Sequence, residues 1–116
     1  MKYLIILVLL SGCAHNDNWR TQDTVMQIGV TAVLMADAIT TSRIQDYPHL
    51  YENGPSKYFL GSNPSTSDTA MYFGTYMLSS YLISRALPHK WRTAWQSVEI
   101  AGHGYAVINN CNNGLC

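Results

Sequence analysis

Long apolar stretches, separated by clusters of proline, glycine and asparagine, indicate helices along most of this chain. The pattern predicts helices over residues 22–45, 65–87 and 90–109. The first is apolar almost all round, the second begins at a capping sequence that opens with Ser65, and Pro88 separates the second from the third. We therefore expect an all-α fold, either a three-helix bundle or a helical hairpin plus a third helix, over residues 22–110.

Two segments carry turn signals instead. Residues 46–64 contain three of the four prolines and several glycines and asparagines, which predicts a loop. Residues 111–116 read as a C-terminal turn whose two cysteines, Cys111 and Cys116, form an even pair. The asparagine and glycine residues between them supply turn conformations that would bring the two Cα atoms within disulfide distance. We expect this pair to be bridged rather than to hold a metal, because no nearby ligand completes a metal site.

The N-terminus has the pattern of a processing signal. Lys2 is followed by the apolar run Tyr3–Leu10, which is far shorter than the ~20 residues needed to cross a bilayer. The sequence Leu10-Ser11-Gly12-Cys13 resembles the bacterial lipobox, which implies removal of residues 1–12 as a lipoprotein signal peptide. Diacylglycerol and a fatty acyl chain would then be attached covalently to Cys13, and residues 13–21 would form the acylated N-terminus and tether. The alternative is an ordinary signal peptide, or a frayed helix, with a chance cysteine.

Such an anchor predicts a protein of the cell envelope that faces the periplasm. Ala14 follows the cysteine where an aspartate would favour retention at the inner membrane, so the outer membrane is slightly favoured. We expect membrane lipid as the first partner, with an envelope protein or a second copy of the chain as further candidates.

The composition bears on the possible partners of the protein and on whether its surface faces water or lipid. With 116 residues the chain forms one domain, and its 7 basic and 7 acidic side chains argue against nucleic acid as a partner. Only 12% of residues are charged, about half the ~25% usual for soluble domains, so part of the surface is expected not to face water. Charges inside all three helices, among them Asp37 and Glu99, oppose membrane spanning. We therefore expect a bundle held at the membrane surface, with spanning helices as the alternative.

The third helix has one polar stripe. At 100° per residue, the stripe contains Arg92, Gln96, Glu99, His103 and Asn110. Glu99 and His103 are one turn apart, a spacing that suits a carboxylate–imidazole pair acting as a general base or as two metal ligands. The simpler interpretation, which we favour, is that the stripe is the water-facing side of an amphipathic helix.

Asp37 is unusual because it interrupts the apolar run of the first helix. A carboxylate in such surroundings needs hydrogen-bond donors or stays protonated. We expect it to be a buried hydrogen-bonding centre that fixes helix packing, or else one wall of a polar site shared with Glu99 and His103.

Three short motifs resemble a group of uncharacterised small helical membrane-associated proteins of bacteria and their phages. They are Asp37-x-x-Thr40-Thr41, Glu52-Asn53-x-Pro55 and Leu60-Gly61-x-x-Pro64-Ser65, and Gly54 splits the Asn-Pro pair usual in the second. The resemblance implies a helical, membrane-linked protein of unassigned activity. It also implies a shared polar cluster, made of Asp37, Thr41, Glu52, Asn53 and Glu99.

These observations favour a membrane-anchored envelope lipoprotein with a binding, occlusion or structural role, and a phage or mobile-element origin would suit such a role. No complete catalytic set is visible, so catalytic residues stay unassigned, and we expect neither a metal nor a cofactor beyond the covalent lipid on Cys13. The alternatives are a small polytopic membrane protein, and an envelope hydrolase or metal-binding protein that uses Asp37, Glu99 and His103.

Overall fold

The computed structural model describes residues 17–52 and 54–116, and within them the fold is all-α, as predicted. The predicted signal peptide and the predicted lipidation site, Cys13, lie outside the described residues. Three long helices, a single helical turn and a short 3-10 helix make up the described fold. They are α2 (Thr21–Ser42), η1 (Arg43–Asp46), α3 (Lys57–Leu60), α4 (Thr66–Ala86) and α5 (His89–Asn112).

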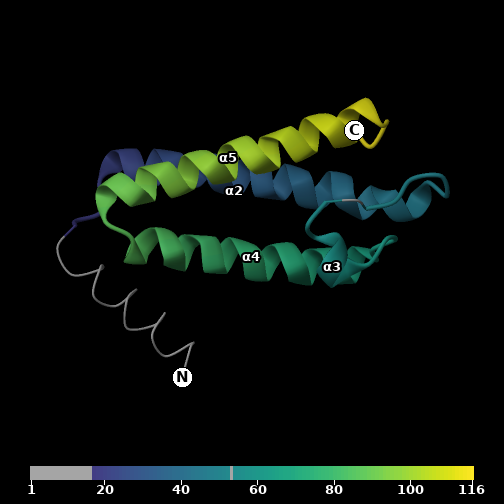
Figure 1. Ribbon diagram of the computed structural model, residues 1–116, viewed down its shortest axis with the longest axis horizontal. Coiled ribbons are helices and arrows are strands. Elements are labelled where there is room, and N and C mark those ends of the chain that lie inside the picture. The colour runs from purple at the N-terminus through teal and green to yellow at the C-terminus, as the bar shows by residue number, and fades with distance from the viewer. Residues whose placement is uncertain (1–16, 53) are drawn as a thin grey trace, which may run out of the picture.

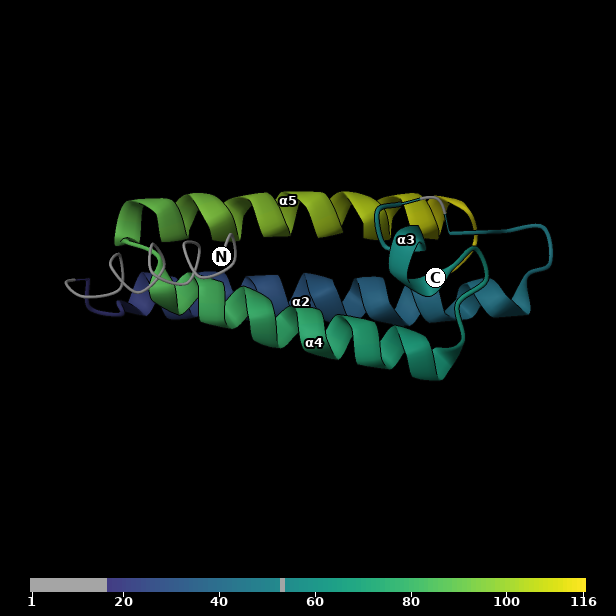
Figure 2. The ribbon, with the colours of Figure 1, turned by 60° about the horizontal axis from the view of Figure 1, so that its bottom comes forward.

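The three long helices run up, down and up as an antiparallel bundle (Figures 1 and 2). α2 packs on both α5 and α4, and at Gly29 the side chain of Ile100 on α5 lies 3.2 Å from the position that a Cβ would take. Leu87 and Pro88 alone join α4 to α5, whereas the α2–α4 connection is long and carries α3. The loop and α3 therefore lie at the same end of the bundle as the C-terminus.

Local sequence signals account for most helix ends. The Ser65 side chain accepts a hydrogen bond from the Asp68 backbone N–H at 3.1 Å, which caps α4 as predicted. Pro88 occupies the N-cap of α5. The predicted C-terminal turn was too long, because α5 continues to Asn112 and the turn begins only at Asn113. The segment 46–64 is a loop as expected, apart from the single turn of α3.

The interior of the bundle is unusually polar. Five hydrophobic side chains among the described residues are fully buried, and ten polar or charged ones are buried as deeply. The hydrophobic cluster at the centre consists of Val30, Leu34 and Phe73. The polar set is Asp23, Asp37, Thr40, Thr41, Thr69, Ser80, Ser84, Arg92, Gln96 and Glu99.

This distribution contradicts the expectation for the stripe on the third helix. Arg92 and Gln96 are 1% and 0% exposed, whereas Val98, on the opposite side of α5, is 66% exposed. The polar stripe therefore faces the other helices and the apolar side faces outward. Helical periodicity identified the two faces of α5 correctly. The prediction that the polar face is in water was wrong, because that face packs against the other helices.

Candidate functional site

The candidate site is built along the buried polar stripe of α5. We call Arg92, Gln96, Glu99, His103 and Asn110 the polar column. Residues at these spacings lie on one side of a helix, so the column follows α5 along most of its length. Each member has a polar partner on α2 or α4.

At the N-terminal end of α5 the column contains a buried ion pair. Arg92 Nη1 lies 2.6 Å from Asp23 Oδ2, and both side chains are almost completely buried. The Arg92 Nε–H also donates to the Ser84 carbonyl oxygen at 2.7 Å, which ties the end of α4 to the pair. His89 Nδ1 lies 3.2 Å from the other carboxylate oxygen of Asp23. One turn further along, Gln96 Nε2 donates to the Gln27 side chain at 3.0 Å.

Trp19 covers this ion pair from the N-terminal side. Its ring centroid lies 5.0 Å from the Arg92 guanidinium carbon and 4.8 Å from that of Arg85, both within cation–π range. The ring also meets Tyr81 edge-on, at 6.0 Å between centroids. The end of the predicted tether therefore packs against the bundle.

Glu99 lies in the middle of the column and is 5% exposed. Its two carboxylate oxygens accept hydrogen bonds from the Tyr76 hydroxyl at 2.9 Å and the Ser80 hydroxyl at 3.1 Å, both on α4. The carboxylate–imidazole pair considered for Glu99 and His103 does not form, because hydroxyl donors from α4 occupy the carboxylate. The His103 ring packs edge-on to the Tyr76 ring instead, at 5.2 Å between centroids.

His103 pairs with Asp37, from the helix furthest away in sequence. Its Nδ1 lies 2.6 Å from Asp37 Oδ2, across a separation of 66 residues. The Thr41 hydroxyl donates to the other carboxylate oxygen at 3.2 Å. Next to this group, Asn110 Nδ2 donates to the Thr40 hydroxyl at 2.9 Å. Asp37 therefore has the hydrogen-bonding surroundings that its place in an apolar helix requires.

Asp37 and His103 also line a cavity of about 360 Å³ between the helices and the long loop. Glu52 contributes from the loop, where one carboxylate oxygen accepts the Gly54 N–H at 2.7 Å. The loop is held by a further bond from the Glu52 N–H to the Ser62 carbonyl oxygen at 2.8 Å. Asn53 lies outside the described residues.

Of the candidate site residues, the structure brings Asp37, Thr41 and His103 into one hydrogen-bonded group and places Glu52 on the same cavity. Glu99 lies one turn away and connects to His103 through the ring of Tyr76. Sequence reasoning missed the pairing of Asp23 with Arg92. Asp23 occupies the first turn of α2, where an acidic residue is ordinary, so only the position of Arg92 on the polar stripe gave a signal.

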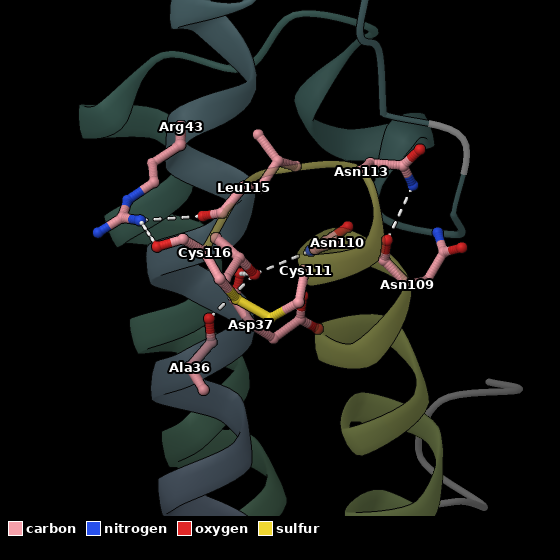
Figure 3. The surroundings of a disulfide bond; sticks show 10 residues. Ala36, Asp37, Arg43, Asn109, Asn110, Cys111, Asn113, Leu115 and Cys116 are labelled. Atoms are coloured by element: carbon pink, nitrogen blue, oxygen red, sulfur yellow. Dashed lines mark hydrogen bonds between the residues drawn. A yellow bond between two sulfur atoms is a disulfide. The ribbon is translucent and has the colours of Figure 1, made fainter.

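The C-terminal end of the site is closed by a disulfide bond between Cys111 and Cys116, whose Cα atoms are 4.7 Å apart. Figure 3 shows the tail folded back over the end of α5, beside α2. Arg43 Nη1 donates to the carbonyl oxygens of Leu115 and Cys116 at 3.0 and 2.8 Å. The Leu115 side chain is 3% exposed, so the tail packs against the bundle rather than extending from it.

The groups of the site can be compared with those that a metal site or a serine nucleophile needs. Within residues 17–52 and 54–116, no group of three His, Cys, Asp or Glu side chains is placed to hold a metal ion. The Ser80 hydroxyl faces a carboxylate, not an imidazole base. No protein-family model matches the sequence, and no curated protein or solved structure is significantly similar to it.

Proposed function

We propose that the helical domain is an integral membrane bundle of the bacterial cell envelope, in which α2, α4 and α5 each cross the bilayer. Its role is binding or structural rather than catalytic. One observation carries this proposal, namely that the bundle is polar inside and apolar outside. In water that distribution leaves a large apolar surface exposed, whereas in lipid the same surface is solvated.

The outward sides of the helices have the composition of lipid-facing surfaces. Near the helix middles, exposed large side chains are apolar, as for Ile28 (65% exposed), Leu78 (60%) and Val98 (66%). Exposed charged side chains on the long helices are confined to the end turns, as at Asp68, Arg85 and Lys90. A charge at the bilayer centre costs at least ~2.5 kcal/mol, so this placement is the one a membrane requires.

Several hydroxyl groups of the helices have the intrahelical partners that a bilayer requires. Hydroxyls on the helix surfaces donate to the carbonyl oxygen one turn back, as Thr31 does to Gln27 (2.9 Å) and Ser97 does to Thr93 (2.8 Å). In hydrocarbon an unsatisfied polar group costs several kcal/mol, because no water replaces the missing partner. Such back-bonding, together with the partners inside the column, lowers that cost.

Helix length is consistent with spanning. The three helices contain 22, 21 and 24 residues, and at 1.5 Å per residue each is roughly as long as the ~30 Å hydrocarbon core is thick. By its own length and composition, one helix of the described chain, Thr21–Asp46, qualifies as a membrane span. α4 and α5 carry more polar residues, and many of those face the interior of the bundle.

Orientation follows from charge and redox chemistry. Three crossings put the N-terminus of α2 and the disulfide on opposite sides of the membrane. The exposed basic side chains at the end where α2 begins are Arg20, Arg85 and Lys90, against Arg43 and Lys57 at the other end. Cytoplasmic ends carry more basic residues, and disulfides persist in the periplasm rather than the cytoplasm. Both rules favour the orientation in which the disulfide end faces the periplasm.

A second candidate function is favoured by the lipobox. A lipidated Cys13 and a disulfide both belong in the periplasm, and a bundle with no crossings satisfies both. The protein would then be a peripheral lipoprotein, slightly favoured at the outer membrane by Ala14, with a binding or occlusion role. Its apolar exterior would be covered by further copies of the chain or by an envelope protein. The hydrolase or metal-binding alternative has less support, because Glu99 is engaged by two hydroxyls.

Replacing Cys13 with alanine separates the two candidates. We expect the Cys13→Ala protein to stay in the membrane after alkaline carbonate extraction, because three helices hold it there, and the parent to incorporate no palmitate analogue. The measurement is metabolic labelling with that analogue, followed by fractionation of inner and outer membranes. Label on the parent that disappears in the variant, together with release into the periplasm, would establish the peripheral lipoprotein and reject the spanning bundle.

Orientation is measured in the same background. In the Cys13→Ala protein the two remaining cysteines are bridged, so a single added cysteine reports its own side of the membrane. A membrane-impermeant maleimide applied to spheroplasts is expected to label Ser62→Cys, in the loop, and to spare Asn18→Cys. Labelling of Asn18→Cys alone would show that the protein has the opposite orientation, with the disulfide end in the cytoplasm.

A further inference from the structure

We propose that the cavity at the loop end of the bundle binds a primary ammonium group. The cavity has a volume of about 360 Å³ and is lined by residues of one chain, from α2, α4, α5 and the loop. That volume is at the lower end of the range for small-molecule sites, so it suits a head group of a few heavy atoms. The inference goes beyond the membrane proposal and does not depend on it, because no second chain or lipid surface is needed to complete the site.

The charge of the lining favours a cation. Two carboxylates, those of Asp37 and Glu52, line the cavity, and His103 is the one basic side chain among the lining residues. The cations nearest in sequence do not line it. Arg43 is engaged with the carbonyl oxygens of the C-terminal tail, and Lys57 is exposed on α3. An anion would therefore meet the Glu52 carboxylate and the Asp37–His103 pair, whereas an ammonium group would be attracted by the carboxylates.

The lining also offers hydrogen-bond acceptors at suitable atoms. Glu52 uses one carboxylate oxygen to accept the Gly54 N–H, and its other oxygen has lone pairs for a ligand. In the neutral imidazole one ring nitrogen donates and the other accepts, so when Nδ1–H donates to Asp37 the second nitrogen, Nε2, is an acceptor. A primary ammonium carries three N–H donors and so suits both acceptors, which a quaternary ammonium could not use.

Aromatic rings supply the rest of the lining. Tyr72, Phe73 and Tyr76 border the cavity, with Tyr72 at 5.1 Å from Phe73 and 6.1 Å from Tyr76 between centroids. The faces of such rings attract cations, most strongly where water is displaced. Carboxylates combined with aromatic rings therefore select an ammonium over a neutral ligand of the same size.

The test uses the full-length protein purified in detergent and titrated with ethanolamine by calorimetry. We expect saturable binding of ethanolamine and none of ethylene glycol, which replaces the ammonium with a hydroxyl. Glu52→Gln is expected to weaken binding roughly tenfold or more, because it removes a charge-assisted contact while keeping an acceptor for the Gly54 N–H. Asp46→Asn is the matched control, because it removes an exposed carboxylate of η1 that lies outside the lining.

Several outcomes would overturn the proposal. They are no saturable binding of ethanolamine, equal binding of ethylene glycol, or equal weakening by Glu52→Gln and Asp46→Asn. Tyr72→Leu, which removes a ring and no charge, is a second variant that should weaken binding if Glu52→Gln does not fold. Failure here would leave the carbonate-extraction result unchanged, so the two proposals are tested separately.

The same site could take a free amine or the head group of phosphatidylethanolamine, which share the ammonium. Reconstitution into vesicles distinguishes these sources. If the head group reaches the cavity, ethanolamine should bind more weakly in vesicles containing phosphatidylethanolamine than in vesicles of phosphatidylglycerol alone. Equal affinity in both would assign a soluble amine.

Discussion

Replacement of Arg92 by leucine is expected to lower the free energy of unfolding by about 3–5 kcal/mol. Arg92 is 1% exposed and its partner Asp23 is 0% exposed, so the variant leaves a buried carboxylate without its main cation. The carbonyl oxygens of Ser84 and Leu87 lose their donor as well, which loosens the turn between α4 and α5. The measurement is chemical unfolding of the purified protein, followed by circular dichroism.

Two further variants make that result specific. Lys90→Leu removes an exposed cation two residues away and should change stability by no more than about 0.5 kcal/mol. A double variant, Asp23→Leu with Arg92→Leu, should lose less free energy of unfolding than the two single variants lose in total. The reason is that the double variant leaves neither charge buried without its partner. Additive effects, or an Arg92→Leu protein as stable as the parent, would show that the pair is not the buried link described above.

Glutamate at Val98 is expected to prevent stable insertion if the outer side of α5 faces lipid. Val98 is 66% exposed near the middle of the helix. A charge at the centre of a bilayer costs about 2.5–3.5 kcal/mol, whereas at an exposed helix position in water the same change is nearly neutral, within about 0.5 kcal/mol. The measurement is the membrane-inserted fraction after carbonate extraction, together with the cellular amount of protein.

Equivalent changes on the other helices test whether the whole exterior behaves alike. Ile28→Glu on α2 and Leu78→Glu on α4 should give the same loss, since both side chains are exposed near their helix middles. Tyr58→Glu is the control, because Tyr58 is 90% exposed but lies on α3, outside the three long helices. If all three helix variants accumulate normally and Tyr58→Glu does too, the exterior does not face lipid and the peripheral candidate takes precedence.

The site could be predicted in part. Asp37 stood out because a carboxylate in an apolar helix must find donors, and it does find them in His103 and Thr41. The tyrosine and serine that bind Glu99 could not be chosen in advance. α4 contains several of each, and local sequence says nothing about which of them face α5.

Local sequence signals were enough to predict the three long helices, the cap at Ser65, the stop at Pro88 and the turn that lets Cys111 meet Cys116. These features depend on interactions between residues close in the chain, which capping residues, proline and asparagine report directly. The sequence also determined which residues share a face of α5, because helical period alone fixes that.

Which face of α5 lies inside the bundle could be learned only from the packed helices. An amphipathic pattern has two sides, and its period is the same whether the polar side faces water or neighbouring helices. Arg92 meets Asp23 across 69 residues and His103 meets Asp37 across 66, so the partners that make a polar interior tolerable come from elsewhere in the chain. Packing therefore decided the direction of the polar column, the cavity beside it and the apolar exterior.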